Sequence, residues 1–579
     1  MSGRILFLVP ARGASLRVPG KNLLPIGGIP LVGRAARAGL AAAAALPGGP
    51  HAVVCSTEDD AIAAAAAAWG AQVVRRPPEL ATDTATSLDV ARHALHAHDA
   101  LDRGGPFETL VLLQPTSPLV DPADVVAAVE RHRASGGTPV TSVVATHPGA
   151  WHHATGDDGT LTPAPPTGPG DVLLAGAFYV VGAAHLRAGG SFVEPGRTLG
   201  HAIRPETAVD VDERVDLAIA EALLAARPAA SFRLGDREIG KGRVFVIAEG
   251  GVNHNGDVAL ARRLIDAAAA AGADAVKFQT FDPVALAAAG APTAGYQRRA
   301  GVEAADQREM LQRLALPTSA WAELQACART RGLVFLSTPF DDGSAELLDR
   351  LGVPAFKVGS GELTNTPFIT RLARRGRPML VSTGMADLVE VAAAVDAVRA
   401  GGDVPLALFH CVSSYPASPS DANLRAIETM RRAFGVPVGW SDHTPGVELA
   451  LAAVAAGATL VEKHLTTDRT LPGPDHQASL EPDAFAAMVA GIRAVEAALG
   501  SGVKAPVEAE RDVTAVARRS LHWATSLPAG AIVAEADVAT LRPGTGLAPA
   551  KIAAVVGRRT VRPVEAGTAV APGDIEGLA

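Results

Sequence analysis

Short apolar runs alternate with helix-like segments along the first 228 residues of the chain. This alternation predicts a three-layer α/β domain with a mostly parallel sheet. An amphipathic helix is expected at 214–225, where the domain ends. The expected strands are residues 5–9, 52–56, 72–75, 110–113, 141–145 and 173–181.

A second series of apolar runs begins at residue 244 and is longer. Helical patterns separate its members, for example at 258–271, 345–351 and 388–399. Eight β/α repeats over roughly 250 residues predict a TIM barrel, whose chemistry collects at the C-terminal ends of its strands. The eight expected strands are 244–248, 275–278, 334–337, 355–358, 379–381, 406–410, 437–440 and 459–461.

Polar side chains stand at the end of each expected barrel strand. A single lysine there is often a surface residue, but two lysines with several hydroxyls aimed at one mouth indicate an anionic, phosphate-bearing substrate. The residues are Glu249, Lys277, Gln279, Thr338, Lys357, Ser360, Ser382, His410, Tyr415, Ser441, His443, Glu462 and His464.

Two of these residues, His443 and His464, are 21 positions apart and follow neighbouring strands. Parallel strands joined by a helix bring equivalent ends side by side, so the two imidazoles should face each other across the rim. Such a pair suits a divalent metal with positions open for substrate. The alternative is a pair of hydrogen-bonded loop histidines, and the matched strand ends favour the metal.

The first strand leads into a loop, residues 11–22, that combines small residues with Arg12, Arg17 and Lys21. Small residues allow backbone N–H groups to close on an anion, so the loop predicts phosphate binding rather than a basic surface turn. Its glycine spacing fits neither a Walker loop nor a dinucleotide motif. Later, Asp210 and Asp212 stand on one side of an extended segment and could hold Mg²⁺ on nucleotide phosphates. Metal-assisted nucleotidyl transfer is the better interpretation, against a solvated edge strand.

The remaining segments complete the predicted organisation. A short linker at 226–231 leads into a hairpin-like stretch over 232–243. Residues 519–579 carry short β-like runs with Pro and Gly turns. A module of about 60 residues is marginal alone, so we expect it to dock on a barrel.

Composition excludes several classes of protein. A net charge of −8 without a long Lys/Arg cluster argues against nucleic acid as a partner. The three widely spaced cysteines form neither a disulfide framework nor a zinc motif. The apolar run at the start is too short for a signal peptide, and the Ala run at 41–45 is far short of a membrane span. A cytoplasmic protein without a membrane partner is expected.

Four ordered motifs in residues 1–228 resemble the cytidylyltransferases that make CMP-sialic acids. They are ARGASLRVPGKN, RPPELATDTATS, LQPTSP and VDVDERVD. The resemblance implies that Arg12, Lys21 and Asn22 bind the CTP phosphates, that Arg76 and Ser87 hold the nucleotide, and that Gln114 meets the sugar acid. Asp210 and Asp212 would carry Mg²⁺. The sequence departs from the family at Leu16, where a Lys is usual, and over Leu173–Tyr179.

A second set of motifs, over about 231–579, is similar to bacterial sialic acid synthases. They include AEGGVNHNG, FKVGSGE, GWSDHT, VEKHLTTDRTLPGPDHQASLEP and LRPGTGL. The resemblance implies Mn²⁺ or a similar ion on His443 and His464. It implies a phosphoenolpyruvate site built from Lys277, Thr338, Lys357, Ser360, Ser382 and Ser441, and amino-sugar contacts from Gln279, Tyr415, Asp475 and Arg542. Ser413 stands where some members carry an Asn.

The two resemblances together imply one bifunctional enzyme in three domains. They are a Rossmann-like cytidylyltransferase domain (1–228), a TIM-barrel synthase domain (231–510) and an antifreeze-like SAF domain (519–579). In such synthases the SAF domain caps the barrel of a partner subunit, so a domain-swapped homodimer is expected. Phosphoenolpyruvate would condense with N-acetylmannosamine or a related hexosamine, with Glu249 steering water or a sugar hydroxyl, and CTP would activate the product. The alternatives are the same reactions on a legionaminic-type 2,4-diacetamido sugar, or an active synthase whose N-terminal domain only binds.

Overall fold

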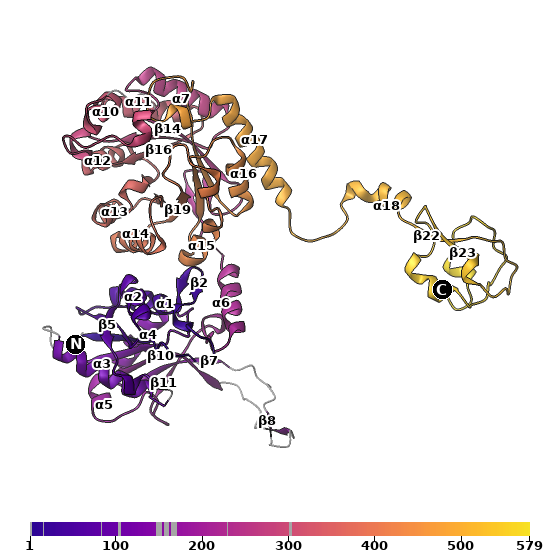
Figure 1. Cartoon of the computed structure of the whole chain (residues 1–579), viewed down its shortest axis with the longest axis horizontal. Coiled ribbons are helices and arrows are strands. Elements are labelled where there is room, and N and C mark those ends of the chain that lie inside the picture. Colours follow the sequence, from indigo (N-terminus) through magenta and orange to yellow (C-terminus); the bar gives the residue numbers. More distant parts are fainter. Residues whose placement is uncertain are drawn as a thin grey trace. The chain divides into compact units, whose positions relative to one another are not determined.

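The computed structural model describes residues 3–15, 17–82, 84–101, 106–145, 153–155, 161–163, 171–228, 230–299 and 304–578. Leu16, at which the sequence departs from the cytidylyltransferase pattern, lies outside these residues, as does Asp83 of the second motif. The chain forms two compact units, residues 1–498 and 499–579. The first unit contains the two large sheets, and the second contains the small C-terminal module (Figure 1).

The first large sheet has seven strands in the order β11-β7-β10-β6-β1-β4-β5. Only β10 runs antiparallel to its neighbours, so the predicted mostly parallel sheet is confirmed. All six expected strands are present, and β11 is the addition, since its sequence LGHA has no apolar run to announce it. The strands are β1 (Ile5–Pro10), β4 (Ala52–Thr57), β5 (Gln72–Arg75), β6 (Thr109–Leu113), β7 (Val140–Ala145), β10 (Val172–Gly182) and β11 (Leu199–Ala202).

Helices cover both faces of this sheet. Phe7 and Val9 of β1 pack with α1, α2 and α4, whereas Leu6 and Leu8 pack with α3 and α5 on the opposite face. Successive strand residues point to opposite faces, so a fully apolar strand builds a core on each side. The three layers predicted for this domain are therefore present. The helices are α1 (Leu31–Ala45), α2 (Asp60–Ala68), α3 (Ser87–Leu101), α4 (Pro122–Ala134), α5 (Ala183–Arg187) and α6 (Arg214–Ala226).

The second large sheet has eight parallel strands in the order β16-β15-β14-β21-β20-β19-β18-β17. Its two end strands, β16 and β17, contact each other, which brings the ring nearly to closure. The predicted TIM barrel is thus confirmed, each strand at its expected place. The strands are β14 (Phe245–Gly251), β15 (Ala275–Thr280), β16 (Val334–Pro339), β17 (Phe356–Val358), β18 (Met379–Ser382), β19 (Leu406–Cys411), β20 (Val438–Asp442) and β21 (Leu460–His464).

Helices surround the barrel strands (Figure 1). Those that alternate with the strands are α7 (Val258–Ala270), α11 (Ala320–Thr330), α12 (Asp342–Leu351), α13 (Thr366–Ala373), α14 (Leu388–Gly401), α15 (Arg425–Phe434), α16 (Glu448–Ala455) and α17 (Pro482–Leu499). Three shorter helices stand between β15 and α11, namely α8 (Pro283–Leu286), α9 (Gly295–Arg299) and α10 (Gln307–Leu314).

The barrel interior changes from apolar to polar along the strands. At the N-terminal end a buried cluster includes Ile247, Ala275, Leu336, Ala355, Leu380, Phe409 and Leu460. Side chains alternate along a strand, so the residue two positions later points into the same interior. Those residues are Glu249, Lys277, Thr338, Lys357, Ser382, Cys411 and Glu462. The barrel therefore has an apolar floor beneath a polar upper layer.

A two-stranded hairpin contributes to the floor. Its strands β12 (Phe232–Leu234) and β13 (Arg237–Ile239) are antiparallel, as the sequence predicted. Leu234 and Ile239 are fully buried in the same cluster as the interior residues of the barrel. The hairpin thus closes the N-terminal end and leaves the C-terminal end as the mouth.

The C-terminal unit is small and rich in turns. An antiparallel pair, β22 (Ser520–Trp523) and β23 (Val538–Leu541), packs Leu521 and Trp523 into a core of its own with Val533, Val564, Val570 and Ile575. Its helices are α18 (Arg511–Ala517) and α19 (Ile552–Val555). Among the helices of the described residues, none combines the length and the apolar character that a membrane span requires.

Candidate functional site

Four charged side chains meet in the upper layer of the barrel. The Nζ atom of Lys277 lies 2.6 Å from an oxygen of Glu249 and 3.7 Å from one of Glu462. Nζ of Lys357 lies 3.4 Å from the same Glu462 oxygen. All four side chains are at most 6% exposed. The two predicted lysines are thus brought together, and Glu462 bridges them.

Burial and mutual contact shift the pKa values of this group. Burial raises the pKa of Glu249 to about 7, against the opposing effect of Lys277. Burial would lower the pKa of Lys277, but Glu249 and Glu462 outweigh it and the pKa is raised. Burial lowers the pKa of Lys357, and the opposing effect of Glu462 does not fully offset the effect of burial. Both acid–base exchange at Glu249 and anion binding at Lys277 are therefore available near neutral pH.

The predicted hydroxyl groups line the same space. Lys277 donates to Thr338 Oγ1 at 3.3 Å, and Lys357 donates to Ser382 Oγ at 2.6 Å. Ser441 Oγ donates to Glu462 at 3.2 Å. Ser360 Oγ accepts the Gly384 N–H at 3.0 Å. This combination of ammonium groups, hydroxyls and a backbone N–H can hold a phosphate ester.

Ser360 has two neighbours that the sequence did not single out. Its hydroxyl lies 3.1 Å from Cys411 Sγ, and a Cβ built on Gly384 would stand 2.9 Å from each of these two atoms and 2.2 Å from Ser413 Oγ. A side chain at position 384 would therefore fill the space, which explains the glycine. The alternation of β19 could have indicated Cys411, since it lies two positions after the buried Phe409.

His443 and His464 face each other at the mouth, as predicted. Their ring centroids are 5.6 Å apart. Nδ1 of His443 lies 2.7 Å from the Val412 carbonyl, which fixes the proton on that nitrogen and leaves Nε2 as a lone-pair donor. Nδ1 of His464 is buried without a hydrogen-bond partner. Burial lowers the pKa of both imidazoles, which keeps them neutral.

This donor set fits a divalent ion with open positions. No group of three or more His, Cys, Asp or Glu side chains arranged for a metal occurs within the described residues. The protein would therefore supply two neutral imidazoles, and substrate oxygens or water would complete the coordination.

Of the predicted amino-sugar contacts of the barrel, Tyr415 packs against the histidine pair. The Tyr415 ring lies 4.2 Å from the His443 ring and 5.9 Å from the His464 ring, measured between centroids. Gln279 Nε2 donates to Glu249 at 3.5 Å. Asp475 is 6% exposed, and burial raises its pKa to about 6, against the opposing effect of Lys277. Arg542 belongs to the C-terminal unit and is exposed there.

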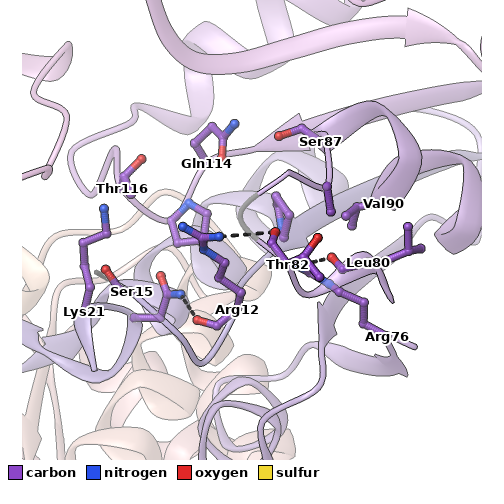
Figure 2. Close-up of a pocket in the computed structure, with 14 residues that line it drawn as sticks. Arg12, Ser15, Lys21, Arg76, Leu80, Thr82, Ser87, Val90, Gln114 and Thr116 are labelled. Atoms are coloured by element: carbon purple, nitrogen blue, oxygen red, sulfur yellow. Dashed lines mark hydrogen bonds between the residues drawn. The ribbon is translucent and has the colours of Figure 1, made fainter. Parts of the chain in front are cut away.

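The N-terminal domain has a cavity of about 280 Å³ at the C-terminal ends of its strands (Figure 2). The residues predicted to contact the nucleotide or the sugar acid line this cavity, namely Arg12, Lys21, Asn22, Arg76, Ser87 and Gln114. Asn22 Nδ2 donates to the Arg12 carbonyl at 2.9 Å and so holds the cationic loop closed. These residues come together because parallel strands direct the loops that follow them to one edge of the sheet.

The two predicted magnesium ligands lie beside this cavity. Asp212 pairs with Arg17 at 3.1 Å and with Lys21 at 3.4 Å. Asp210 hydrogen-bonds Thr116, which lines the cavity. Two carboxylates next to the cationic loop suit Mg²⁺, which takes one or two carboxylates and substrate phosphates.

Comparison with known proteins gives the same division of the chain. The Cytidylyltransferase family matches residues 6–150, the NeuB family residues 264–504 and the SAF domain residues 518–576. The first two matches fall within their predicted domains, and the third begins one residue before the predicted SAF domain. The exact bounds of the domains stay a prediction.

The synthase part of the chain matches its relatives over nearly the whole of their length. The N,N'-diacetyllegionaminic acid synthase of Legionella pneumophila is 44% identical over 328 residues, which is 56% of this chain and 92% of the relative. The enzyme of the same name from Campylobacter jejuni is 39% identical and covers 55% and 95%. The N-acetylneuraminate-9-phosphate synthase of Homo sapiens is 35% identical and covers 55% and 89%. The chain therefore belongs to the NeuB family of synthases and carries a cytidylyltransferase domain before, and a SAF domain after, its synthase barrel.

Proposed function

We propose that this protein makes a nonulosonic acid and activates it in one chain. The barrel condenses phosphoenolpyruvate with an N-acyl hexosamine and releases phosphate. The N-terminal domain couples the resulting acid to CMP and releases pyrophosphate. The observation that carries the first activity is the buried group of Lys277, Lys357, Glu249 and Glu462 next to two facing imidazoles.

Phosphoenolpyruvate binds between the two lysines. Lys277 and Lys357 neutralise its phosphate and carboxylate, while Thr338, Ser360, Ser382 and Ser441 donate or accept the remaining hydrogen bonds. The enol is held so that its C3 forms a bond with the aldehyde carbon of the open-chain sugar. Water then adds at C2, and phosphate leaves with the C2–O bond electrons.

Glu249 is the carboxylate that exchanges a proton with this water or with a sugar hydroxyl. Its pKa of about 7 suits both directions of transfer near neutral pH. Glu462 stays ionised, because Lys277, Lys357 and His443 together outweigh burial and lower its pKa. Its role is to hold the two ammonium groups in place.

Mn²⁺ or a similar divalent ion on His443 and His464 would act as a Lewis acid toward the aldehyde oxygen. Tyr415, which packs on His443, together with Gln279 and Asp475, would bind the amino sugar around it. From the SAF domain, Arg542 would complete the site of a partner subunit in a homodimer.

In the N-terminal domain, Arg12, Lys21 and Asn22 bind the phosphates of CTP, and Arg76 and Ser87 hold the nucleotide. The 2-hydroxyl of the sugar acid, held by Gln114, attacks the α-phosphorus, and pyrophosphate departs with the electrons of the broken P–O bond. Mg²⁺ on Asp210 and Asp212 would supply positive charge to the phosphates.

Two amino-sugar substrates are candidates. The identity of 44% with a legionaminic acid synthase favours a 2,4-diacetamido hexosamine over N-acetylmannosamine, since the N-acetylneuraminate-9-phosphate synthase of Homo sapiens is 35% identical. We therefore propose a legionaminic-type acid as the product, with a sialic acid as the second candidate.

The test is phosphate release from phosphoenolpyruvate with each amino sugar, followed by pyrophosphate release from CTP with each nine-carbon acid. Sugar-dependent phosphate release and acid-dependent pyrophosphate release support both activities. Phosphate release that does not depend on the sugar contradicts the synthase assignment.

A further inference from the structure

Two loops at the mouth of the barrel are joined by buried hydrogen bonds. One is residues 252–257 after β14, which contains the sequence Asn253-His254-Asn255. The other is residues 472–479 after β21, which contains Asp475. Because β14 and β21 are neighbours in the sheet, the loops that follow them start side by side.

Asn255 makes the outer connection. Its Nδ2 donates to the Pro472 carbonyl at 2.8 Å, and its Oδ1 lies 3.4 Å from Nε2 of His476. The Asn255 backbone has a φ of 50°, in the left-handed region. A non-glycine residue there is under strain that the surrounding contacts must offset, and such residues collect at functional sites.

The His476 side chain links Asn255 to Thr466, which follows β21. The ring has no exposed surface, and burial lowers its pKa to about 4, so the imidazole is neutral. Its Nε2 lies 3.4 Å from Asn255 Oδ1, and its Nδ1 lies 2.7 Å from Thr466 Oγ1. A neutral imidazole has one N–H and one lone-pair nitrogen, so both ring nitrogens can take part in the network.

Asn253 makes the inner connection. Its Nδ2 donates to the Leu465 carbonyl at 3.0 Å and to Ser479 Oγ at 2.8 Å. Ser479 Oγ in turn donates to the Asp475 carbonyl at 2.7 Å. Asn253 is fully buried and Ser479 is 2% exposed. The backbone of Asp475 is therefore fixed on both sides, by Asn255 through His476 and by Asn253 through Ser479.

The carboxylate of Asp475 is available to accept hydrogen bonds from a ligand. The structure records no hydrogen bond to its carboxylate from the described residues, and Lys277 of the charged group acts on it electrostatically. Hydrogen-bond donors stabilise a carboxylate that is only slightly exposed, and a bound ligand can supply them. Sugar hydroxyl and amide N–H groups are donors of this kind.

We propose that Asn255 and His476 are positioning residues for the amino sugar. They hold the segment 472–479 so that the Asp475 carboxylate points into the mouth, and they thereby set the KM for the sugar without touching it. This inference rests on the proposed condensation, but the segment's rigidity can be measured without it.

The first test is Asn255→Gly. Glycine keeps the positive φ at no steric cost and removes only the two side-chain hydrogen bonds. The KM for the amino sugar should rise about tenfold, the effect of one or two lost hydrogen bonds, while the KM for phosphoenolpyruvate stays within about twofold. Pyrophosphate release by the N-terminal domain should not change.

Asn423→Gly is the matched control. Asn423 has a φ of 41° and is exposed in the loop after β19, so the same substitution is made at a similar backbone geometry away from Asp475. Thr466→Val is the second variant of the network, since it removes the hydroxyl that contacts His476 Nδ1 and that also bonds the backbone of Asp468. It should reproduce the rise in KM for the sugar, whereas Asn423→Gly should not.

Hydrogen–deuterium exchange supplies the readout that does not need turnover. Asn255→Gly and Thr466→Val should each speed exchange of the amides of residues 476–480 at least tenfold relative to wild type and Asn423→Gly. Unchanged exchange overturns the inference even in a protein that condenses nothing. Faster exchange with an unchanged sugar KM, or with equal rises in both KM values, also overturns it.

Discussion

Lys463 and Asp442 form an ion pair without any exposed surface, one residue before His464 and His443 respectively. Their Nζ and Oδ2 atoms are 2.7 Å apart, and both side chains are 0% exposed. Lys463 also donates to the Thr444 carbonyl, and Asp442 Oδ1 accepts the Thr444 N–H and hydroxyl. The pair therefore ties β20 to β21 directly behind the two imidazoles.

Lys463→Met is expected to weaken both the barrel and its metal site. The substitution leaves the Asp442 carboxylate buried without its ion-pair partner, which costs roughly 3–5 kcal/mol of stability. It also removes the contact that fixes the distance between the two imidazoles. Mn²⁺ affinity, measured by titration calorimetry, should fall about 10- to 100-fold. The double variant Asp442→Asn/Lys463→Met should recover part of the stability. An unchanged Mn²⁺ affinity in Lys463→Met would show that the pair does not position the histidines.

Glu249→Gln tests the proposed proton exchange. The amide keeps the size and can still accept from Lys277, but it cannot take up a proton. We expect a loss of at least about 100-fold in kcat for the condensation, the usual contribution of general acid–base catalysis. Pyrophosphate release from CTP, measured on the same sample, serves as the folding control. Retention of most of the condensation activity would remove Glu249 from the mechanism.

Asp475 gives the barrel a distinct pH dependence. Its pKa is raised from 3.8 to about 6, so between these values the folded protein holds a proton that the unfolded chain releases. The contribution of Asp475 to the free energy of unfolding is therefore largest at low pH, and it falls by up to about 3 kcal/mol as the pH rises from 4 to 6.

Asp475→Asn should remove this fall. The comparison is the denaturant midpoint of wild type and variant at pH 4.5 and pH 7.5, with Asp236→Asn at an exposed site as the control. The stability of the variant relative to wild type should be greater at pH 7.5 than at pH 4.5. A difference that is the same at both pH values would mean that Asp475 titrates normally.

Asp212→Ala and Lys21→Ala separate the two activities. Each removes a charge beside the nucleotide cavity, and we expect pyrophosphate release to drop at least about 100-fold while phosphate release from phosphoenolpyruvate is unchanged. CTP-dependent thermal stabilisation of the wild type reports binding alone. Stabilisation by CTP without any pyrophosphate release would identify a domain that binds but does not transfer.

The sequence predicted the barrel well because its interior follows a simple rule. Apolar floor residues such as Ala275 and Leu460 are followed two positions later, on the same face, by a residue of the upper layer, here Lys277 and Glu462. Most barrel strands extend past the C-terminal end of their apolar run, as β21 does through Glu462 and Lys463 to His464. Polar residues at the end of a strand do not extend its apolar run. The prediction from the sequence therefore placed them in the loop after the strand.

The parts that the sequence missed depend on contacts between distant segments. Nothing near Glu462 in the chain indicates that it bridges two lysines from β15 and β17. Asn253 and Asn255 stood in a motif without a role until the loop after β21 was placed against them. The strand β11 was missed for a local reason, because Leu199 is the one large apolar residue among its four residues.

The central claim, that one chain makes and then activates a nonulosonic acid, is tested most directly by mass spectrometry of the product. Wild type incubated with phosphoenolpyruvate, CTP and a 2,4-diacetamido hexosamine or N-acetylmannosamine should yield a CMP-linked nine-carbon acid. The variant His443→Ala/His464→Ala should yield none, yet should form it from a supplied nine-carbon acid and CTP. A wild-type mixture that contains no new carbon–carbon bond with either sugar would contradict the account.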